Sequence, residues 1–165
     1  MMKSIKRNAI RKDFFSFLLP WFFIITLGTF VSLWEFAGGG DPEFKLSLSS
    51  FVGLFLIIFA LPIVFPAAVT LGRSYSSTLI IRKDHKLVQH GIYKYIRHPI
   101  YFGTILVFLG LPLILASLYG FFTMVLVIPL FLNRIKNEEK LLIEEFGEEY
   151  ERYKETSRKL IPFLF

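Results

Sequence analysis

The sequence predicts an all-α, polytopic integral membrane protein with about four transmembrane helices and a cytosolic C-terminal amphipathic helix. Hydrophobic residues make up 54% of the 165 positions, and the mean hydropathy of +0.56 exceeds what the core of a soluble domain of this size requires. Long uncharged runs alternate with short charged segments, and the length leaves room for one domain, residues 1–165. Much of the apolar surface must therefore face lipid.

The first uncharged run covers residues 14–34. Its 21 positions match the roughly 20 residues with which a helix crosses about 30 Å of hydrocarbon. A basic leader precedes the run, but the run is too long for the apolar core of a signal peptide and no A-x-A cleavage pattern follows it. We predict an uncleaved first span.

A second uncharged run, residues 46–72, contains Pro62 and Pro66. Membrane helices tolerate proline better than soluble helices do, because neighbouring helices can satisfy the freed carbonyl groups. We expect a second span here, with a kink.

The third uncharged run, residues 100–133, is too long for one span. As a single helix its 34 residues would measure about 51 Å. Two shorter spans joined as a hairpin fit better. Residues 117–120, Ser-Leu-Tyr-Gly, offer the turn, and Gly110 and Pro112 are rival breaks.

A charged segment follows from residue 134 to about residue 153. Five apolar or aromatic residues recur in it, mostly at three- and four-residue steps: Ile135, Leu142, Phe146, Tyr150 and Tyr153. This spacing is typical of an amphipathic helix on the membrane surface, which Gly147 would weaken.

The distribution of charge orients these spans. Five Lys or Arg precede the first span and six lie in residues 73–97, whereas residues 35–45 carry three acids and one base. Because basic loops favour the cytoplasmic side, both termini and residues 73–98 are predicted to be cytoplasmic. Membrane topology explains the split of the basic residues between two short segments better than a nucleic-acid partner does, so membrane lipids and no nucleic acid are expected as partners. The oligomeric state is not indicated.

Potential binding chemistry is concentrated in residues 71–101. Pro99 is a natural first residue for the third span, so His98 is expected just outside a helix N-terminus. Free backbone N–H groups there favour an anionic group, such as the carboxylate of an amino-acid-like ligand. Gly91 permits a tight turn before Tyr93 and Tyr95, whose rings can lie against an adenine or near a sulfonium.

Metal and cysteine chemistry are not expected. The chain has no cysteine, which excludes a disulfide framework, a thiolate metal site and a cysteine nucleophile. His85, His90 and His98 lie in a single loop at irregular spacing, which argues against a metal cluster.

Four motifs together resemble the isoprenylcysteine carboxyl methyltransferases, whose wider superfamily includes phospholipid methyltransferases. They are HKLV at residues 85–88, GIY at 91–93, RHPIY at 97–101, and the tail RIKNEEKLLIEEFGEEYERYKETSRKLIP at 134–162. The resemblance covers residues 71–162, and the N-terminal spans share only hydrophobicity with that family.

The resemblance implies an enzyme that uses S-adenosylmethionine and a lipid-borne acceptor. Within the single domain, residues 1–71 would form N-terminal spans and residues 72–165 the cofactor-binding loop, the helical hairpin and the C-terminal helix. Arg134 would face the acceptor carboxylate. The positions implied to bind the cofactor are His85, Lys86, Leu87, Val88, Tyr93, His98, Pro99, Ile100, Tyr101 and Glu138.

The chemistry of methyl transfer makes these roles plausible. A carboxylate already presents a lone pair, so positioning is the main requirement. We expect Arg134 to orient the carboxylate more than to activate it, since tight pairing would reduce its nucleophilicity. An amine acceptor would instead need a base such as Glu138, Glu139 or His98.

Three further hypotheses stay open. The chain could methylate a phospholipid amine or a thiol. It could be a sterol-type membrane reductase that uses NADPH. Arg73, Arg82 and Lys83 would then be candidates to bind the 2′-phosphate of that cofactor. It could also be a non-catalytic membrane protein.

Several singled-out residues also have purely structural interpretations. Arg134 and Glu138 are spaced as a surface ion pair on a helix. Arg82, Lys94 and Arg97 are also consistent with residues that only set the membrane topology and bind anionic lipid headgroups. The acids of residues 138–155, apart from Glu138, are expected to form a solvated face. Tyr93, Tyr95 and Tyr101 are also consistent with ordinary aromatic residues at the membrane–water interface.

Overall fold

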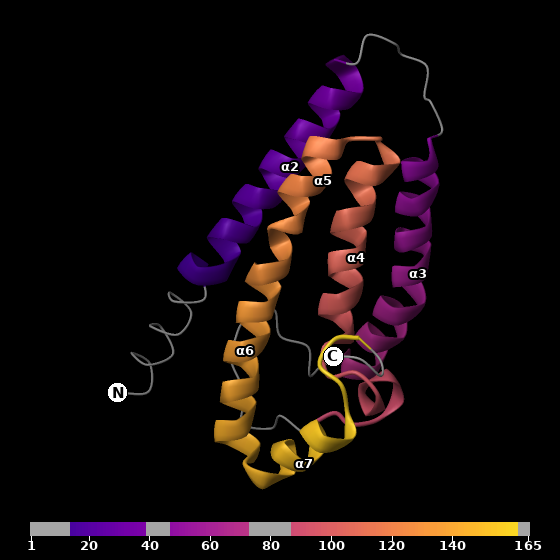
Figure 1. Ribbon diagram of the computed structural model, residues 1–165. Coiled ribbons are helices and arrows are strands. Elements are labelled where there is room, and N and C mark those ends of the chain that lie inside the picture. Colours follow the sequence, from indigo (N-terminus) through magenta and orange to yellow (C-terminus); the bar gives the residue numbers. More distant parts are fainter. Residues whose placement is uncertain (1–13, 39–46, 73–86, 162–165) are drawn as a thin grey trace.

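The computed structural model describes residues 14–38, 47–72 and 87–161, and this part of the chain is helical. The prediction of an all-α protein is therefore confirmed (Figure 1). In the described ranges the only β feature is an isolated bridge between Ile96 and Arg158. The elements, in chain order, are η1 (Phe14–Leu18), α2 (Leu19–Gly38), α3 (Leu48–Leu71), η3 (Gly91–Lys94), α4 (Pro99–Ile114), α5 (Leu118–Val125), α6 (Val127–Phe146) and α7 (Glu148–Thr156).

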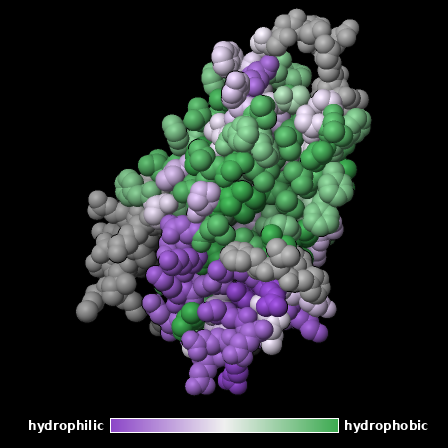
Figure 2. Space-filling model, in the orientation of Figure 1, coloured by the Kyte–Doolittle hydropathy of each residue, from purple (hydrophilic) through white to green (hydrophobic). Residues whose placement is uncertain are grey.

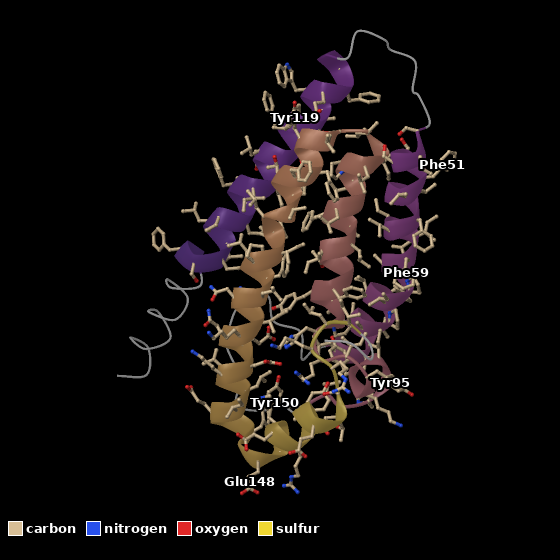
Figure 3. All side chains as sticks on the ribbon, in the orientation of Figure 1. Phe51, Phe59, Tyr95, Tyr119, Glu148 and Tyr150 are labelled. Atoms are coloured by element: carbon tan, nitrogen blue, oxygen red, sulfur yellow. The ribbon has the colours of Figure 1, made fainter. Side chains whose placement is uncertain are left out.

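Within the described residues, three helical segments are long and apolar enough to cross a membrane: Phe15–Gly38, Leu48–Leu71 and Leu118–Phe146. The fourth apolar helix, α4, is shorter, with 16 residues. Large apolar side chains point outward from these helices, as Phe51 and Phe59 do from α3 (Figure 3). The upper part of the molecule is accordingly apolar, and the lower end is hydrophilic (Figure 2). Such a surface suits a helix bundle embedded in lipid.

The predicted hairpin within residues 100–133 is confirmed, but its turn lies slightly earlier than expected. Leu115 and Ala116 make the turn, with Ala116 at a φ of 50°. Ser117 then caps α5, because its hydroxyl accepts a hydrogen bond from the N–H of Gly120 at 3.0 Å. The stretch 117–120 was wrongly placed as the turn, since it forms the first turn of a helix.

Small residues bring the helices close together. A Cβ built on Gly53 of α3 would lie 2.5 Å from the carbonyl oxygen of Gly110 in α4. A Cβ built on Gly120 of α5 would lie 2.1 Å from the hydroxyl of Ser32 in α2. Backbone approach of this kind is how membrane helices gain packing contact where the hydrophobic effect between them is weak.

The C-terminal charged segment differs from its prediction. Two helices replace the single amphipathic one, because α6 ends at Phe146 and Gly147, at a φ of 54°, reverses the chain into α7. The charged half of α6 also continues the helix of the preceding span, with only Leu126 between α5 and α6. Charged side chains are therefore held on a rigid extension of a membrane helix.

The opposite end of the bundle is fastened by Glu35, near the end of α2. Its carboxylate accepts hydrogen bonds from the hydroxyl of Ser117 and from the backbone N–H groups of Tyr119 at 3.1 Å and Gly120 at 3.3 Å. These N–H groups belong to the first turn of α5 and have no partner within their own helix. Glu35 thus caps a helix other than its own and joins α2 to the hairpin.

Candidate functional site

The hydrophilic end of the bundle is formed where α4 begins and α6 leaves the apolar layer. Pro99 is the first residue of α4 and His98 is its N-cap, as the sequence predicts, but the backbone of His98, at a φ of −124° and a ψ of 55°, is not in the extended form that a residue before proline favours. On α6, Phe131 and Ile135 are buried in the bundle. Arg134 and Glu138 lie beside this buried stripe, and Glu139 continues it by one further four-residue step.

Arg134, Tyr101 and Glu138 form one hydrogen-bonded chain between α6 and α4. Arg134 Nε donates to the Tyr101 hydroxyl at 3.0 Å, and that hydroxyl donates to Glu138 Oε2 at 2.7 Å. Arg134 is only 4% exposed. Arg134 is therefore not an exposed member of a surface ion pair, and the Tyr101 phenol links its guanidinium to the Glu138 carboxylate.

His98 packs on this chain from the N-terminal end of α4. Its ring stacks on that of Tyr101 with centroids 5.7 Å apart and planes 11° apart. The side chain is 5% exposed, and its Nε2 lies 3.5 Å from Glu139 Oε1. Hydrogen-bond geometry is not met there, so among the described residues this buried nitrogen has no hydrogen-bond partner.

Arg97 and Glu139 form the centre of a second cluster of polar residues. Arg97 Nε donates to Glu139 Oε1 at 2.9 Å, and Arg97 Nη1 donates to the carbonyl oxygens of Ser157 at 2.6 Å and Lys154 at 3.2 Å. The side chains of Arg97 and Glu139 are 8% and 11% exposed. Lys159 adds a second cation, with Nζ 4.0 Å from Glu139 Oε2.

These contacts correct two sequence-based expectations. Arg97 does not serve anionic headgroups, since it is buried and bonded to protein groups. Glu139 is not part of a solvated acidic face, since it is 8% exposed. The four-residue steps from Phe131 through Ile135 to Glu139 could have indicated this burial.

The C-terminal segment is tied to the chain that leads into α4. The N–H groups of Arg97 and His98 donate to the carbonyls of Arg158 at 2.8 Å and Lys159 at 3.1 Å, and Arg158 N–H donates to Tyr95 O at 2.9 Å. The backbone immediately before the α4 N-terminus is thereby held by main-chain bonds.

Two buried tyrosines of α7 complete this end. The Tyr153 hydroxyl donates to the carbonyl of Tyr93 at 2.5 Å, and the Tyr150 hydroxyl donates to Glu139 Oε1 at 3.5 Å. Burial raises the pKa of Tyr153 to about 12, although Arg97 and Ser157 oppose the shift. Burial and then Glu139 also raise the pKa of Tyr150 well above its ordinary value. Both phenols therefore stay protonated and act as donors at neutral pH.

The burial of the remaining predicted site residues is known only where the structure describes them. Pro99 and Tyr93 are buried, and Leu87, Val88 and Ile100 are partly buried. His85 and Lys86 lie outside the described residues, as do Arg73, Arg82 and Lys83, on which the nicotinamide hypothesis depends. Among the side chains that are described, no group of three or more could hold a metal ion.

Similarity to known proteins is extensive over the part of the chain that builds this site. A family model described as the isoprenylcysteine carboxyl methyltransferase (ICMT) family matches residues 52–144. A probable protein-S-isoprenylcysteine O-methyltransferase from Oryza sativa subsp. indica is 36% identical over 127 residues, covering 74% of this chain and 66% of the relative. The protein-S-isoprenylcysteine O-methyltransferase of Dictyostelium discoideum is 33% identical over 159 residues, covering 93% of this chain and 59% of the relative.

A solved structure is also similar. The eukaryotic intramembrane Ras methyltransferase ICMT superposes with a TM-score of 0.74 at 28% identity, over 84% of this chain and 52% of that one. The chain thus spans about half to two thirds of the length of these relatives. Helix α2 lies before the residues that the family model matches.

Proposed function

Because the chain belongs to the isoprenylcysteine carboxyl methyltransferase family, we propose that it transfers the methyl group of S-adenosylmethionine to a carboxylate on a lipid-borne acceptor. An S-isoprenylated cysteine is the first candidate for that acceptor. The observation that carries the proposal is the hydrogen-bonded chain from the buried Arg134 through Tyr101 to Glu138, which joins the start of α4 to α6. It places a cation and a carboxylate a few ångströms apart at the polar end of an apolar bundle.

The residues at this end fit the methyl donor. The donor carries an ammonium, a carboxylate, an adenosine group and a sulfonium, and it supplies an electrophilic methyl group when bound. Glu138 is partly exposed and can pair with a cationic group, and the buried Nε2 of His98 offers an unmatched polar atom beside the α4 N-terminus. We assign the cofactor side to the positions named above, including His85, Lys86, Leu87, Val88, Tyr93, Pro99, Ile100 and Tyr101.

Arg134 is assigned to the acceptor side. Its bond to Tyr101 fixes the orientation of the guanidinium, so that an incoming carboxylate meets a cation already held in place. A carboxylate attacks as its own nucleophile and needs no general base. A buried guanidinium is a poor neighbour for an ammonium acceptor, which favours carboxylate over amine methylation.

The proposed topology has four spans in one domain covering residues 1–165. Helix α4 has 16 residues, and the uncharged arm of the α5–α6 segment, residues 118–133, is of equal length. Each arm measures about 24 Å, short of about 30 Å of hydrocarbon, and local thinning of the bilayer or tilting of neighbours accommodates such a mismatch. Both termini, the site and the C-terminal amphipathic region then lie on the cytoplasmic side.

The test is a transfer assay with the purified protein in lipid nanodiscs. Radiolabelled S-adenosylmethionine is supplied with an S-farnesylated cysteine derivative, with its carboxamide analogue, or with phosphatidylethanolamine. We expect alkali-labile label, as a methyl ester, only on the free carboxylate. Label on the amine lipid would replace the proposal by phospholipid methylation, and NADPH binding without donor binding would replace it by a reductase.

Two variants test the division of the site. Glu138→Gln should weaken donor binding, measured by titration calorimetry, about tenfold or more, since a hydrogen bond to a charged group contributes about 1.5–3 kcal/mol. Arg134→Gln should leave donor binding within about threefold and abolish transfer to the carboxylate. The exposed Glu144 provides the matched control for Glu138, and Glu144→Gln should change neither quantity.

A further inference from the structure

Phe17, in the η1 turn that leads into α2, lies against Arg134. Its ring centroid is 4.2 Å from the Arg134 guanidinium carbon, and the residue is 8% exposed. The ring of Phe131 meets that of Phe17 edge-on, with centroids 5.3 Å apart. This is a cation–π contact removed from water, the setting in which such contacts are strongest.

The position of Phe17 follows from the pattern of α2. One stripe at three- and four-residue steps faces the bundle: Phe17, Trp21, Ile24, Gly28 and Ser32. Phe22, Phe23 and Phe30, on other faces of the helix, are about two thirds exposed. Along the same stripe, α2 approaches α5 closely, with Gly28 against Met124 and Ser32 against Gly120.

We propose that Phe17 is a positioning residue for the acceptor carboxylate and acts through Arg134; the inference rests on the function proposed above. The Phe17 ring covers the guanidinium from the α2 side, and the Nε of the same guanidinium donates to Tyr101. Both contacts restrict the rotation of a long side chain before the acceptor arrives. The η1 turn, which precedes the family-matched residues 52–144, thereby contributes to acceptor recognition.

The decisive comparison is between Phe17→Leu and Phe17→Tyr. Leucine keeps the apolar character without the aromatic face, whereas tyrosine keeps the face. We expect Phe17→Leu to raise the KM for the prenylcysteine acceptor about tenfold with kcat and donor affinity little changed, and Phe17→Tyr to stay within about threefold of the parent. Phe22→Leu, on the exposed side of the same helix, is the matched control and should have no effect.

A double substitution separates positioning from general packing. If Phe17 acts through the guanidinium, Phe17→Leu should not weaken acceptor binding further in an Arg134→Gln background, whereas a packing defect would persist there. Acceptor binding is measured by titration calorimetry with the farnesylated cysteine alone, which needs no turnover. A parent-like acceptor affinity in Phe17→Leu, or an equal loss in the Arg134→Gln background, would overturn the inference.

The same measurements distinguish this inference from the proposed function. A parent protein that binds the carboxylate acceptor but transfers no methyl group would contradict the proposed activity, and the Phe17 comparison would still be decided by binding. Phe17→Leu could instead lower the melting temperature and weaken donor binding while Phe22→Leu changes neither. That result would show that Phe17 has a structural role and would overturn the positioning role.

Discussion

Glu139 is a buried carboxylate whose charge is compensated by the Arg97 side chain. Taking a charge out of water costs several kcal/mol unless it is paired, and removing one partner leaves the other uncompensated. We therefore expect Glu139→Ala to lower the free energy of unfolding by about 3 kcal/mol, toward the low end of the range because Arg97 retains its carbonyl acceptors. Thermal unfolding in detergent measures this loss. Glu145→Ala, on the exposed side of α6, should be neutral, and a Glu139→Ala variant as stable as this control would contradict the prediction.

Tyr153 gives the protein a sensitivity to alkaline pH. Its pKa is raised to about 12 in the folded state, against about 10 in an unfolded chain, so folding favours the neutral phenol. This contribution is fully present below pH ~10 and is lost as the pH rises through ~12; two pKa units correspond to roughly 2–3 kcal/mol. We expect a late step in the tyrosinate absorbance titration that Tyr153→Phe diminishes and Tyr95→Phe leaves in place. An unchanged titration in Tyr153→Phe would contradict the assignment.

At the scale of the element, Glu35 shows how one helix can complete another. Its carboxylate accepts from Ser117, Tyr119 and Gly120 at the start of α5. Loss of a helix cap costs about 0.5–2 kcal/mol, so Glu35→Ala should lower the melting temperature, with the exposed Thr29→Ala as control. Ser117 shares the same network, and Glu35→Ala with Ser117→Ala should destabilise by less than the sum of the two. Strict additivity would mean that the two residues stabilise the protein independently.

The helices could be predicted from the sequence because each depends on local pattern. Uncharged runs located α2, α3 and the hairpin, and Pro99 located the start of α4. The turn before α5 could not be placed, since Ser117 is suited both to a turn and to a helix cap, and the contact with Glu35, 82 residues away, is invisible to local pattern. The same reason hid the pairing of Arg97 with Glu139, which are 42 residues apart.

Across the whole molecule, the site depends on bringing the start of α4 to the middle of α6. The motifs identified Tyr101, Arg134 and Glu138 by resemblance, and the structure joins these residues in one hydrogen-bonded chain. The resemblance assigns no function to Phe17, which lies outside the four motifs, or to Glu139, which lies within the tail motif. The contact of Phe17 forms only when η1 and α2 pack beside α6, and the contacts of Glu139 form where α6 meets the segment before α4 and the C-terminal segment that includes α7; Figure 1 shows this arrangement of the elements.

The proposed four-span topology can be tested directly because the chain contains no cysteine. Tyr119 and Glu148 lie at opposite ends of the molecule, and Tyr119 is 70% exposed (Figure 3). If α4 and the α5–α6 segment both cross the bilayer, a membrane-impermeant maleimide should label Glu148→Cys only from the cytoplasmic side and Tyr119→Cys only from the opposite side. Sealed vesicles of both orientations provide the measurement. Labelling of both cysteines from the cytoplasmic side would make the hairpin re-entrant, with 16-residue arms too short to cross about 30 Å of hydrocarbon.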